Sequence, residues 1–122
     1  MVLLLQTLRE ALDVYGQSMN PPYHFELIVA CPAGPSNYNI LHVAEMNQYL
    51  DFWNLIAYDF AGSWSNVTGD QANLLSSLDN PGSTPFSAQQ AISYYTSHGV
   101  APQKVILGMP LYGRSFTATD GL

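Results

Sequence analysis

Two short apolar runs end in polar side chains that can hold and polarise a ligand. Residues 54–60 read Asn-Leu-Ile-Ala-Tyr-Asp-Phe, and residues 106–114 read Ile-Leu-Gly-Met-Pro-Leu-Tyr-Gly-Arg. In a barrel of parallel strands, the residues at the carboxyl ends of the strands line the active-site mouth. The phenol, carboxylate and guanidinium groups that end these two runs are hydrogen-bonding groups suited to a neutral, hydroxyl-rich ligand.

The elements that must position these groups alternate between helices and strands. A helical spacing of Leu5, Leu8, Leu12 and Tyr15 predicts an amphipathic helix over residues 1–17. Further helices are predicted over residues 42–49 and after Ser87, which begins a capping box with Gln90. Strands are predicted over residues 25–30, 53–59 and 104–109. This order is typical of an α/β fold with a parallel sheet.

Local patterns refine the surroundings of the second predicted strand. Asn54, Ile56 and Tyr58 fall on one face and Leu55 with Ala57 on the other, so a strand covered on both faces is expected. Residues 60–85 are rich in Gly, Ser, Asn and Asp, and a loop of this length in a compact domain is usually functional. From pattern alone, an open flavodoxin-like sheet fits as well as a barrel.

Composition excludes several classes of partner. Three basic against nine acidic residues give a net charge of −6, which argues against binding of a nucleic-acid backbone. No apolar run approaches the ~18 residues of a membrane span. The single Cys31 excludes an internal disulfide, and no Cys/His cluster has metal-ligand spacing. His24, His42 and His98 are expected to be structural.

Three segments together resemble a known family. Residues 29–35, 56–59 and 109–114 are similar to the ends of strands five, six and seven of fungal-type family 18 glycoside hydrolases, the chitinases. The resemblance implies a partial TIM (β/α)8 barrel of about three βα units, with residues 1–122 as a partial catalytic domain. A complete barrel needs roughly 250 residues. Ile56 stands where the family often has methionine, a swap that conserves volume.

The resemblance also implies a mechanism and a site. Family 18 enzymes retain configuration through attack by the substrate's own N-acetyl carbonyl, while a glutamic acid protonates the glycosidic oxygen. Asp59 and Tyr58 match assisting catalytic residues: Tyr58 holds the acetyl carbonyl, and the negative charge of Asp59 favours the developing cation. The substrate-binding residues implied are these two with Trp64, Met109, Tyr112 and Arg114. No metal or cofactor is implied, and the partner would be chitin or a chito-oligosaccharide.

Simpler interpretations stand beside these assignments. Tyr58 alone would read as a core aromatic, and Asp59 alone as a loop or helix cap. Arg114 would also serve as a surface ion-pair partner, and Trp64 would also pack over the long loop. The association of Tyr58 with Asp59, followed one βαβ unit later by Tyr-Gly-Arg, favours the functional reading.

One motif of the family is absent. No Asp-x-x-Asp-x-Asp-x-Glu occurs, and Glu26 and Glu45, expected in mid-strand and mid-helix, are rejected as catalytic. We therefore expect the catalytic glutamate outside this chain, and the chain alone to be neither stable nor active. The alternatives are a non-catalytic, chitinase-like carbohydrate-binding protein, or a truncated product with no independent function. By resemblance, the location is extracellular or at the cell wall.

Overall fold

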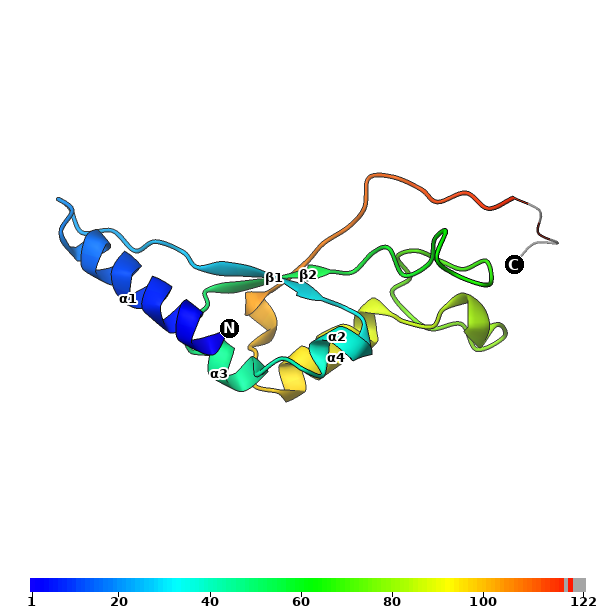
Figure 1. Ribbon diagram of the computed structural model, residues 1–122, viewed down its shortest axis with the longest axis horizontal. Coiled ribbons are helices and arrows are strands. Elements are labelled where there is room, and N and C mark those ends of the chain that lie inside the picture. Colours follow the sequence, from blue (N-terminus) through cyan, green and yellow to red (C-terminus); the bar gives the residue numbers. More distant parts are fainter. Residues whose placement is uncertain (118, 120–122) are drawn as a thin grey trace.

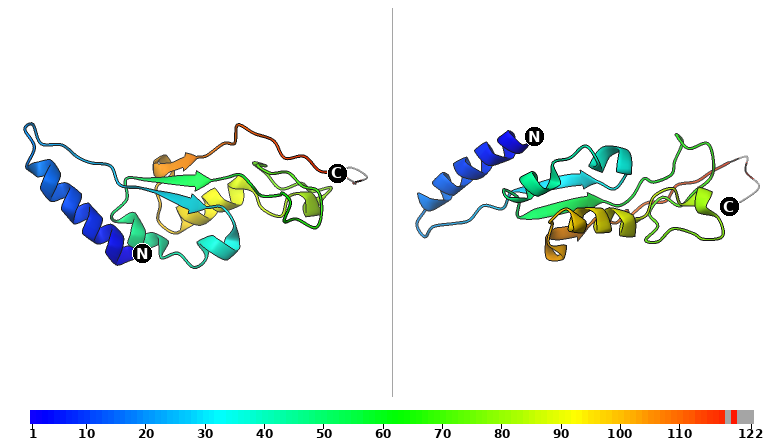
Figure 2. Two further views of the ribbon diagram at one scale, coloured as in Figure 1. Left: turned by 45° about the horizontal axis from the view of Figure 1, so that its top comes forward. Right: turned by 90° about the horizontal axis from the view of Figure 1, so that it is seen from below.

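Three parallel strands form the centre of the molecule. The structure is a computed structural model and describes residues 1–117 and 119. The strands are β1 (Ile28–Pro32), β2 (Phe52–Ile56) and β3 (Val105–Leu107), in the spatial order β1-β2-β3. Both neighbouring pairs are parallel, as predicted, and the strand arrows of β1 and β2 run side by side in Figures 1 and 2.

Helices precede and connect the strands. They are α1 (Val2–Gln17), α2 (Pro35–Tyr38), α3 (Val43–Asn47) and α4 (Ala88–Ser97), with short 3-10 turns η1 (Pro81–Ser83) and η2 (Pro102–Lys104). Helix α4 begins as the capping box predicts, because Ser87 Oγ accepts a hydrogen bond of 3.2 Å from the Gln90 amide. It ends before Gly99, which has a φ of +95°.

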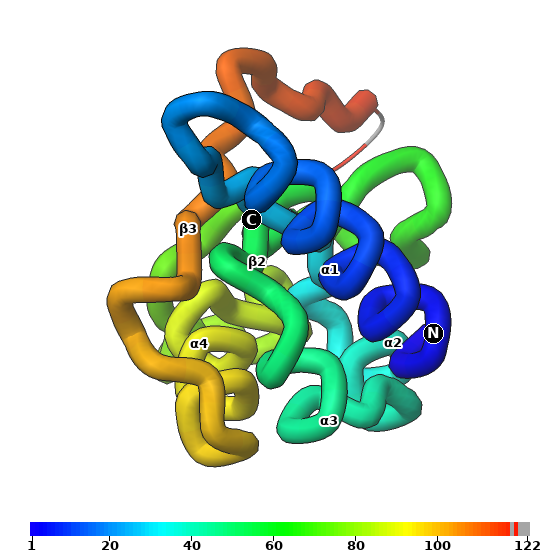
Figure 3. The backbone as a smooth tube through the Cα atoms, turned by 90° about the vertical axis from the view of Figure 1, so that its left-hand side faces the viewer, coloured from blue at the N-terminus to red at the C-terminus, as the bar shows by residue number. Residues whose placement is uncertain are grey.

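The core lies on one face of the sheet. Figure 3 looks along the strands and shows α2, α3 and α4 on the same side of the sheet. Trp53 and Leu55 point from β2 into this layer, where they are 0 % and 1 % exposed. They pack with Met46 of α3 and Tyr95 of α4, both of which are also buried. Burial of these large side chains is the main stabilising contribution of the fold.

The opposite face of the sheet is open, which corrects the expectation of a strand covered on both sides. Asn54 and Ile56 are exposed, and the two register partners of Asn54, Ala30 and Ile106, are exposed as well. The physical reason is that none of the described helices packs on this face. The apolar residues on both faces of β2 suit burial on both sides, but the described residues cover only one side.

Several predicted boundaries were wrong. The first strand begins at Ile28, so Glu26 precedes the strand and does not lie within it. The second ends at Ile56 and the third at Leu107, earlier than predicted. Within the predicted apolar stripe of α1 only Leu5 is fully buried; Leu8 and Tyr15 are exposed, and Tyr15 stacks on Phe25 at 5.7 Å.

Candidate functional site

A sharp change of backbone direction follows β2. The Ala57 amide donates to the Leu55 carbonyl two residues back at 3.0 Å, which ends the ladder. Asp59 then adopts a φ of +60°, the left-handed region that a non-glycine residue occupies at a cost. The Phe60 amide donates to the Gln71 carbonyl at 3.0 Å. The long loop thus returns to the strand end and holds the residue that follows Asp59.

The carboxylate of Asp59 collects donors from the segment after β3. Tyr112 Oη donates to Asp59 Oδ1 at 2.8 Å. Arg114 donates to the same oxygen through Nη2 at 2.6 Å and through Nε at 3.2 Å. Parallel pairing brings the carboxyl ends of β2 and β3 to one edge of the sheet, as Figure 1 shows for the segments that follow them. The structure therefore joins three of the predicted site residues directly.

This arrangement favours the charged form of the acid. Hydrogen bonds from Arg114 and Tyr112 hold the pKa of Asp59 below its usual value of 3.8. The same contact raises the pKa of Tyr112, since losing its proton would place a phenolate against a carboxylate. The pKa of Arg114 is raised for the matching reason. At neutral pH the cluster is thus a fixed anion held by a cation and a neutral phenol.

Two aromatic rings lie close to the guanidinium group of Arg114. The Arg114 Cζ atom lies 5.0 Å from the centroid of the Trp64 ring and 5.5 Å from that of Tyr112, distances typical of cation–π contacts. Tyr58 meets the Tyr112 ring edge to face at 6.4 Å. Tyr58, Asp59, Trp64, Tyr112 and Arg114 form one connected set, which we call the Asp59 cluster.

Trp64 lies directly on the backbone of Gly62. A Cβ atom added at Gly62 would lie 2.6 to 2.9 Å from three atoms of the Trp64 ring. A turn fixes this approach, because the Ser65 amide donates to the Gly62 carbonyl and Ser65 Oγ accepts from the Gly62 amide. The ring stays 58 % exposed, so it covers glycine on one side and remains accessible to solvent.

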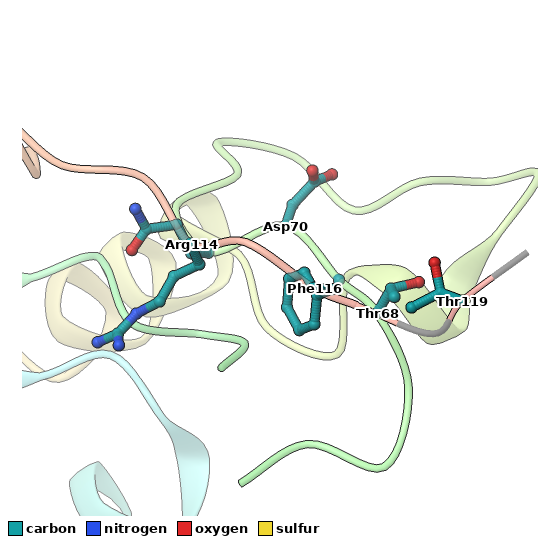
Figure 4. Close-up of a pocket in the computed structure, with 7 residues that line it drawn as sticks. Thr68, Asp70, Arg114, Phe116 and Thr119 are labelled. Atoms are coloured by element: carbon teal, nitrogen blue, oxygen red, sulfur yellow. The ribbon is translucent and has the colours of Figure 1, made fainter. Parts of the chain in front are cut away.

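Three hollows adjoin the cluster. One, of about 220 Å³, lies between the ends of β1 and β2 and is lined by Tyr58, Asp59 and Phe86 among others. The second, of about 370 Å³, lies between loop residues 68–71 and the segment with Arg114 and Phe116. Figure 4 shows Arg114 and Phe116 beside Thr68 and Asp70, with the guanidinium group turned away from Phe116. The third, of about 460 Å³, lies between the turn at residues 62–65 and residues 113–117. Asp59 therefore borders one hollow and Arg114 borders two.

The remaining predicted residues lie apart from these contacts. Met109 is 75 % exposed and precedes the segment that reaches Asp59. His24 lies at the opposite end of the sheet, where its Nε2 atom is 2.8 Å from Oδ1 of Asp51. Within the described residues, no group of three or more His, Cys, Asp or Glu side chains is placed to hold a metal ion. None of the described helices is long and apolar enough to cross a membrane.

Gln71 was missed by the sequence analysis. Its side-chain Nε2 donates to the Tyr112 carbonyl at 2.6 Å, so it joins the long loop to the segment after β3. A polar residue in a polar loop carries no sequence signal for such a contact. The same holds for Gly62, since its closeness to Trp64 depends on the fold of the turn.

Comparison with known proteins gives consistent results. The family model described as glycosyl hydrolases family 18 matches residues 1–121. Chitinase 1 of Aphanocladium album is 50 % identical over 122 residues, which is 100 % of this chain and 29 % of that protein. Endochitinase 1 of Metarhizium robertsii is 48 % identical with the same coverage.

A solved structure agrees over nearly the whole chain. YKL-39, solved in the presence of chitooligosaccharides (GlcNAc4), superposes with a TM-score of 0.86 at 30 % identity, covering 98 % of this chain and 34 % of that one. The chain thus spans about a third of that structure and 29 % of the length of the curated relatives it matches.

Proposed function

This chain belongs to family 18 of the glycosyl hydrolases, and from that premise we propose that it supplies the substrate-holding part of a chitinase active site. The proposed substrate is a polymer of β-1,4-linked N-acetylglucosamine. One observation carries the proposal: the Asp59 carboxylate, at the end of β2, is held by Tyr112 and Arg114 from the segment after β3. Residues 1–122 would be a partial catalytic domain.

The geometry suits substrate-assisted, retaining hydrolysis. The Tyr58 hydroxyl has no hydrogen-bond partner among the described residues, so it is available to donate to the substrate's N-acetyl carbonyl. The three donors from Tyr112 and Arg114 share Oδ1 of Asp59, which leaves Oδ2 to accept from the acetamido N–H. A fixed anion beside this group stabilises the positive oxazolinium intermediate. Asp59 and Tyr58 are thus the proposed assisting catalytic residues.

Neighbouring sugars would contact the rest of the site. Trp64 offers exposed indole surface for the C–H groups of a pyranose ring, with Arg114 and Tyr112 beside it, and Met109 is proposed as a further sugar contact. The general acid is proposed to be a glutamate outside residues 1–122, because the sequence contains no Asp-x-x-Asp-x-Asp-x-Glu. An extracellular or cell-wall setting is part of this proposal and rests on the family resemblance.

The test is an Asp59→Asn substitution in the full-length protein that carries these residues. The amide keeps the shape but removes the negative charge, so we expect kcat for tetra-N-acetylchitotetraose to fall by about 10²–10³-fold. The exposed Asp79→Asn variant is the matched control. Hydrolysis by Asp59→Asn at the wild-type rate would remove Asp59 from the mechanism.

A second candidate function is carbohydrate binding without hydrolysis. It is supported by the Asp59 cluster, which supplies groups that can hold a sugar and includes no residue proposed as the general acid. Titration of the full-length protein with tetra-N-acetylchitotetraose, followed by product analysis, separates the two. Binding with no released sugar would support this second candidate. Products that retain the anomeric configuration at the new reducing end would support the first.

A further inference from the structure

The segment that carries Tyr112 and Arg114 has few backbone attachments. After β3, the Gly108 amide donates to the Leu55 carbonyl at 2.9 Å. Between residues 109 and 117, the carbonyl of Tyr112 is the one backbone group that hydrogen-bonds to another part of the described chain. Its donor is Gln71 Nε2, at 2.6 Å. One backbone contact therefore holds this segment, in addition to the side-chain contacts of Tyr112 and Arg114 with Asp59.

Gln71 also holds the other side of the cluster. Its backbone carbonyl accepts from the Phe60 amide, which fixes the chain immediately after the left-handed Asp59. One residue thus binds the backbone next to Asp59 and, through its side chain, the backbone of Tyr112. The side-chain orientation is determined by chemistry, because a carbonyl oxygen only accepts and the amide nitrogen is the group that donates.

We propose that Gln71 is a positioning residue, which sets the Tyr112–Arg114 segment at the distance from Asp59 that the substrate-holding site requires. The inference rests on the proposed function for its consequence in catalysis, but its geometric part stands on the contacts alone. Gln71 touches no reacting group in this scheme. It acts through Tyr112, by fixing where the phenol and the guanidinium group meet the carboxylate.

The contact can be removed with little other change. The Oε1 atom of Gln71 is buried and has no partner among the described residues, so the amide contributes one side-chain hydrogen bond. A Gln71→Met substitution keeps the length of the side chain and the backbone carbonyl that Phe60 uses, and it removes the Nε2 donor together with the Oε1 atom that has no partner. Gln103 is exposed at η2, near the opposite end of β3, so Gln103→Met is the matched control.

The experiment measures structure and kinetics of both variants in the full-length protein. In a crystal structure of Gln71→Met, we expect the Tyr112 and Arg114 contacts with Asp59 to lengthen or break, while Gln103→Met keeps them. Because small misplacements of substrate-positioning groups cost up to about 10²-fold in rate, we expect kcat/KM for tetra-N-acetylchitotetraose to fall by about 10- to 100-fold. The acidic limb of the pH profile should move to higher pH, since Asp59 loses donors that lower its pKa.

The outcomes separate the two proposals. Unchanged Asp59 contacts and an unchanged pH profile in Gln71→Met would overturn the positioning role, whatever the melting temperature does. A lower melting temperature with intact contacts and wild-type kcat/KM would also overturn it, because Gln71 would then serve only the loop. If the wild-type protein neither binds nor cleaves the oligosaccharide, the proposed function fails, and the crystal structures still decide the geometric claim.

Discussion

At the scale of single residues, Asp59 is the residue that the other polar groups of the candidate site contact. Its carboxylate accepts from Tyr112 and Arg114, and its left-handed backbone turns the chain out of the sheet. The alternative role of Arg114, as an ion-pair partner, is observed in the structure. Its Nη2 atom lies 2.6 Å from Oδ1 of Asp59, which is the carboxylate of the candidate site. The two interpretations therefore describe one contact, and substrate contact stays a prediction.

Gly62 provides a residue-scale prediction. A Gly62→Ala substitution places a methyl group within about 3 Å of the Trp64 ring, so the ring must move off the turn. We expect affinity of the full-length protein for tetra-N-acetylchitotetraose to fall about threefold to tenfold, the equivalent of about 0.5–1.5 kcal/mol of aromatic contact. Isothermal titration calorimetry measures this.

Gly113 supplies the control for that experiment. A Cβ atom at Gly113 meets nothing within 4 Å, so Gly113→Ala should leave affinity and Trp64 fluorescence unchanged. Wild-type affinity in Gly62→Ala would show that the indole ring contributes nothing to ligand binding where it now lies.

At the scale of elements, helix α1 is fastened to the sheet by one acid at the end opposite the site. Asp51 accepts from the Leu27 amide at 2.7 Å and from Arg9 Nη1 at 3.1 Å, and it pairs with His24 at 2.8 Å. Arg9, on α1, also donates to the Phe25 carbonyl at 2.7 Å. This network links the helix, the strand that follows it, and the start of β2.

We expect Asp51→Ala to lower the free energy of unfolding by about 1–3 kcal/mol, because the Leu27 amide and Arg9 lose their acceptor. Thermal and urea unfolding of the full-length protein measure the change, with the exposed Asp79→Ala as control. An unchanged midpoint in Asp51→Ala would show that the network does not stabilise the fold.

The same network predicts how the stability of the fold changes with pH. Partial burial opposes ionisation of Asp51, but its donors and the charges of His24 and Arg9 outweigh this and lower the pKa. A lowered folded-state pKa contributes stability that is present above the usual value of 3.8 and is lost as pH falls through the lowered value. The stability difference between wild type and Asp51→Ala should therefore shrink in strong acid.

At the scale of the whole molecule, burial is one-sided. The core between the sheet and α2, α3 and α4 contains Trp53, Tyr95 and Cys31, while the other face of the sheet exposes Ile56 and Ile106. Tyr95 Oη donates to the Pro32 carbonyl at 2.9 Å and so joins α4 to the end of β1. A sheet with one solvated apolar face is a weak fold on its own.

The reactivity of the Cys31 thiol shows whether the buried core is formed. Burial raises the pKa of its thiol to about 11, so the thiolate is scarce at pH 8 wherever the core is formed. We expect Cys31 to resist iodoacetamide in the full-length protein. In the isolated 122-residue chain we expect rapid labelling and no cooperative thermal transition by circular dichroism.

Either measurement, thermal melting or Cys31 labelling, could contradict these expectations. A sharp melting transition of the isolated chain, with Cys31 protected, would show that one covered face is enough for a stable fold. Labelling in the full-length protein at the rate of a denatured control would instead show that the core around Tyr95 is open.

The family resemblance and the α/β fold with a parallel sheet were predicted from the sequence, and both are confirmed. They are readable because apolar runs, caps and the Tyr-Asp and Tyr-Gly-Arg motifs are local patterns. Strand ends were less predictable: β2 ends at Ile56 and Asp59 then adopts a left-handed conformation, which Asp favours more than most non-glycine residues but which its presence does not predict.

Only the tertiary structure decided how the site is held together. Tyr58, Asp59, Trp64, Tyr112 and Arg114 were named from the sequence as candidates, but nothing local says that Arg114 lies between two rings or that Tyr112 meets Oδ1 of Asp59. The same is true of Gln71 and Gly62. Each acts through a partner distant in the chain or through a backbone approach, and parallel pairing of β2 with β3 is what brings those partners within hydrogen-bonding distance.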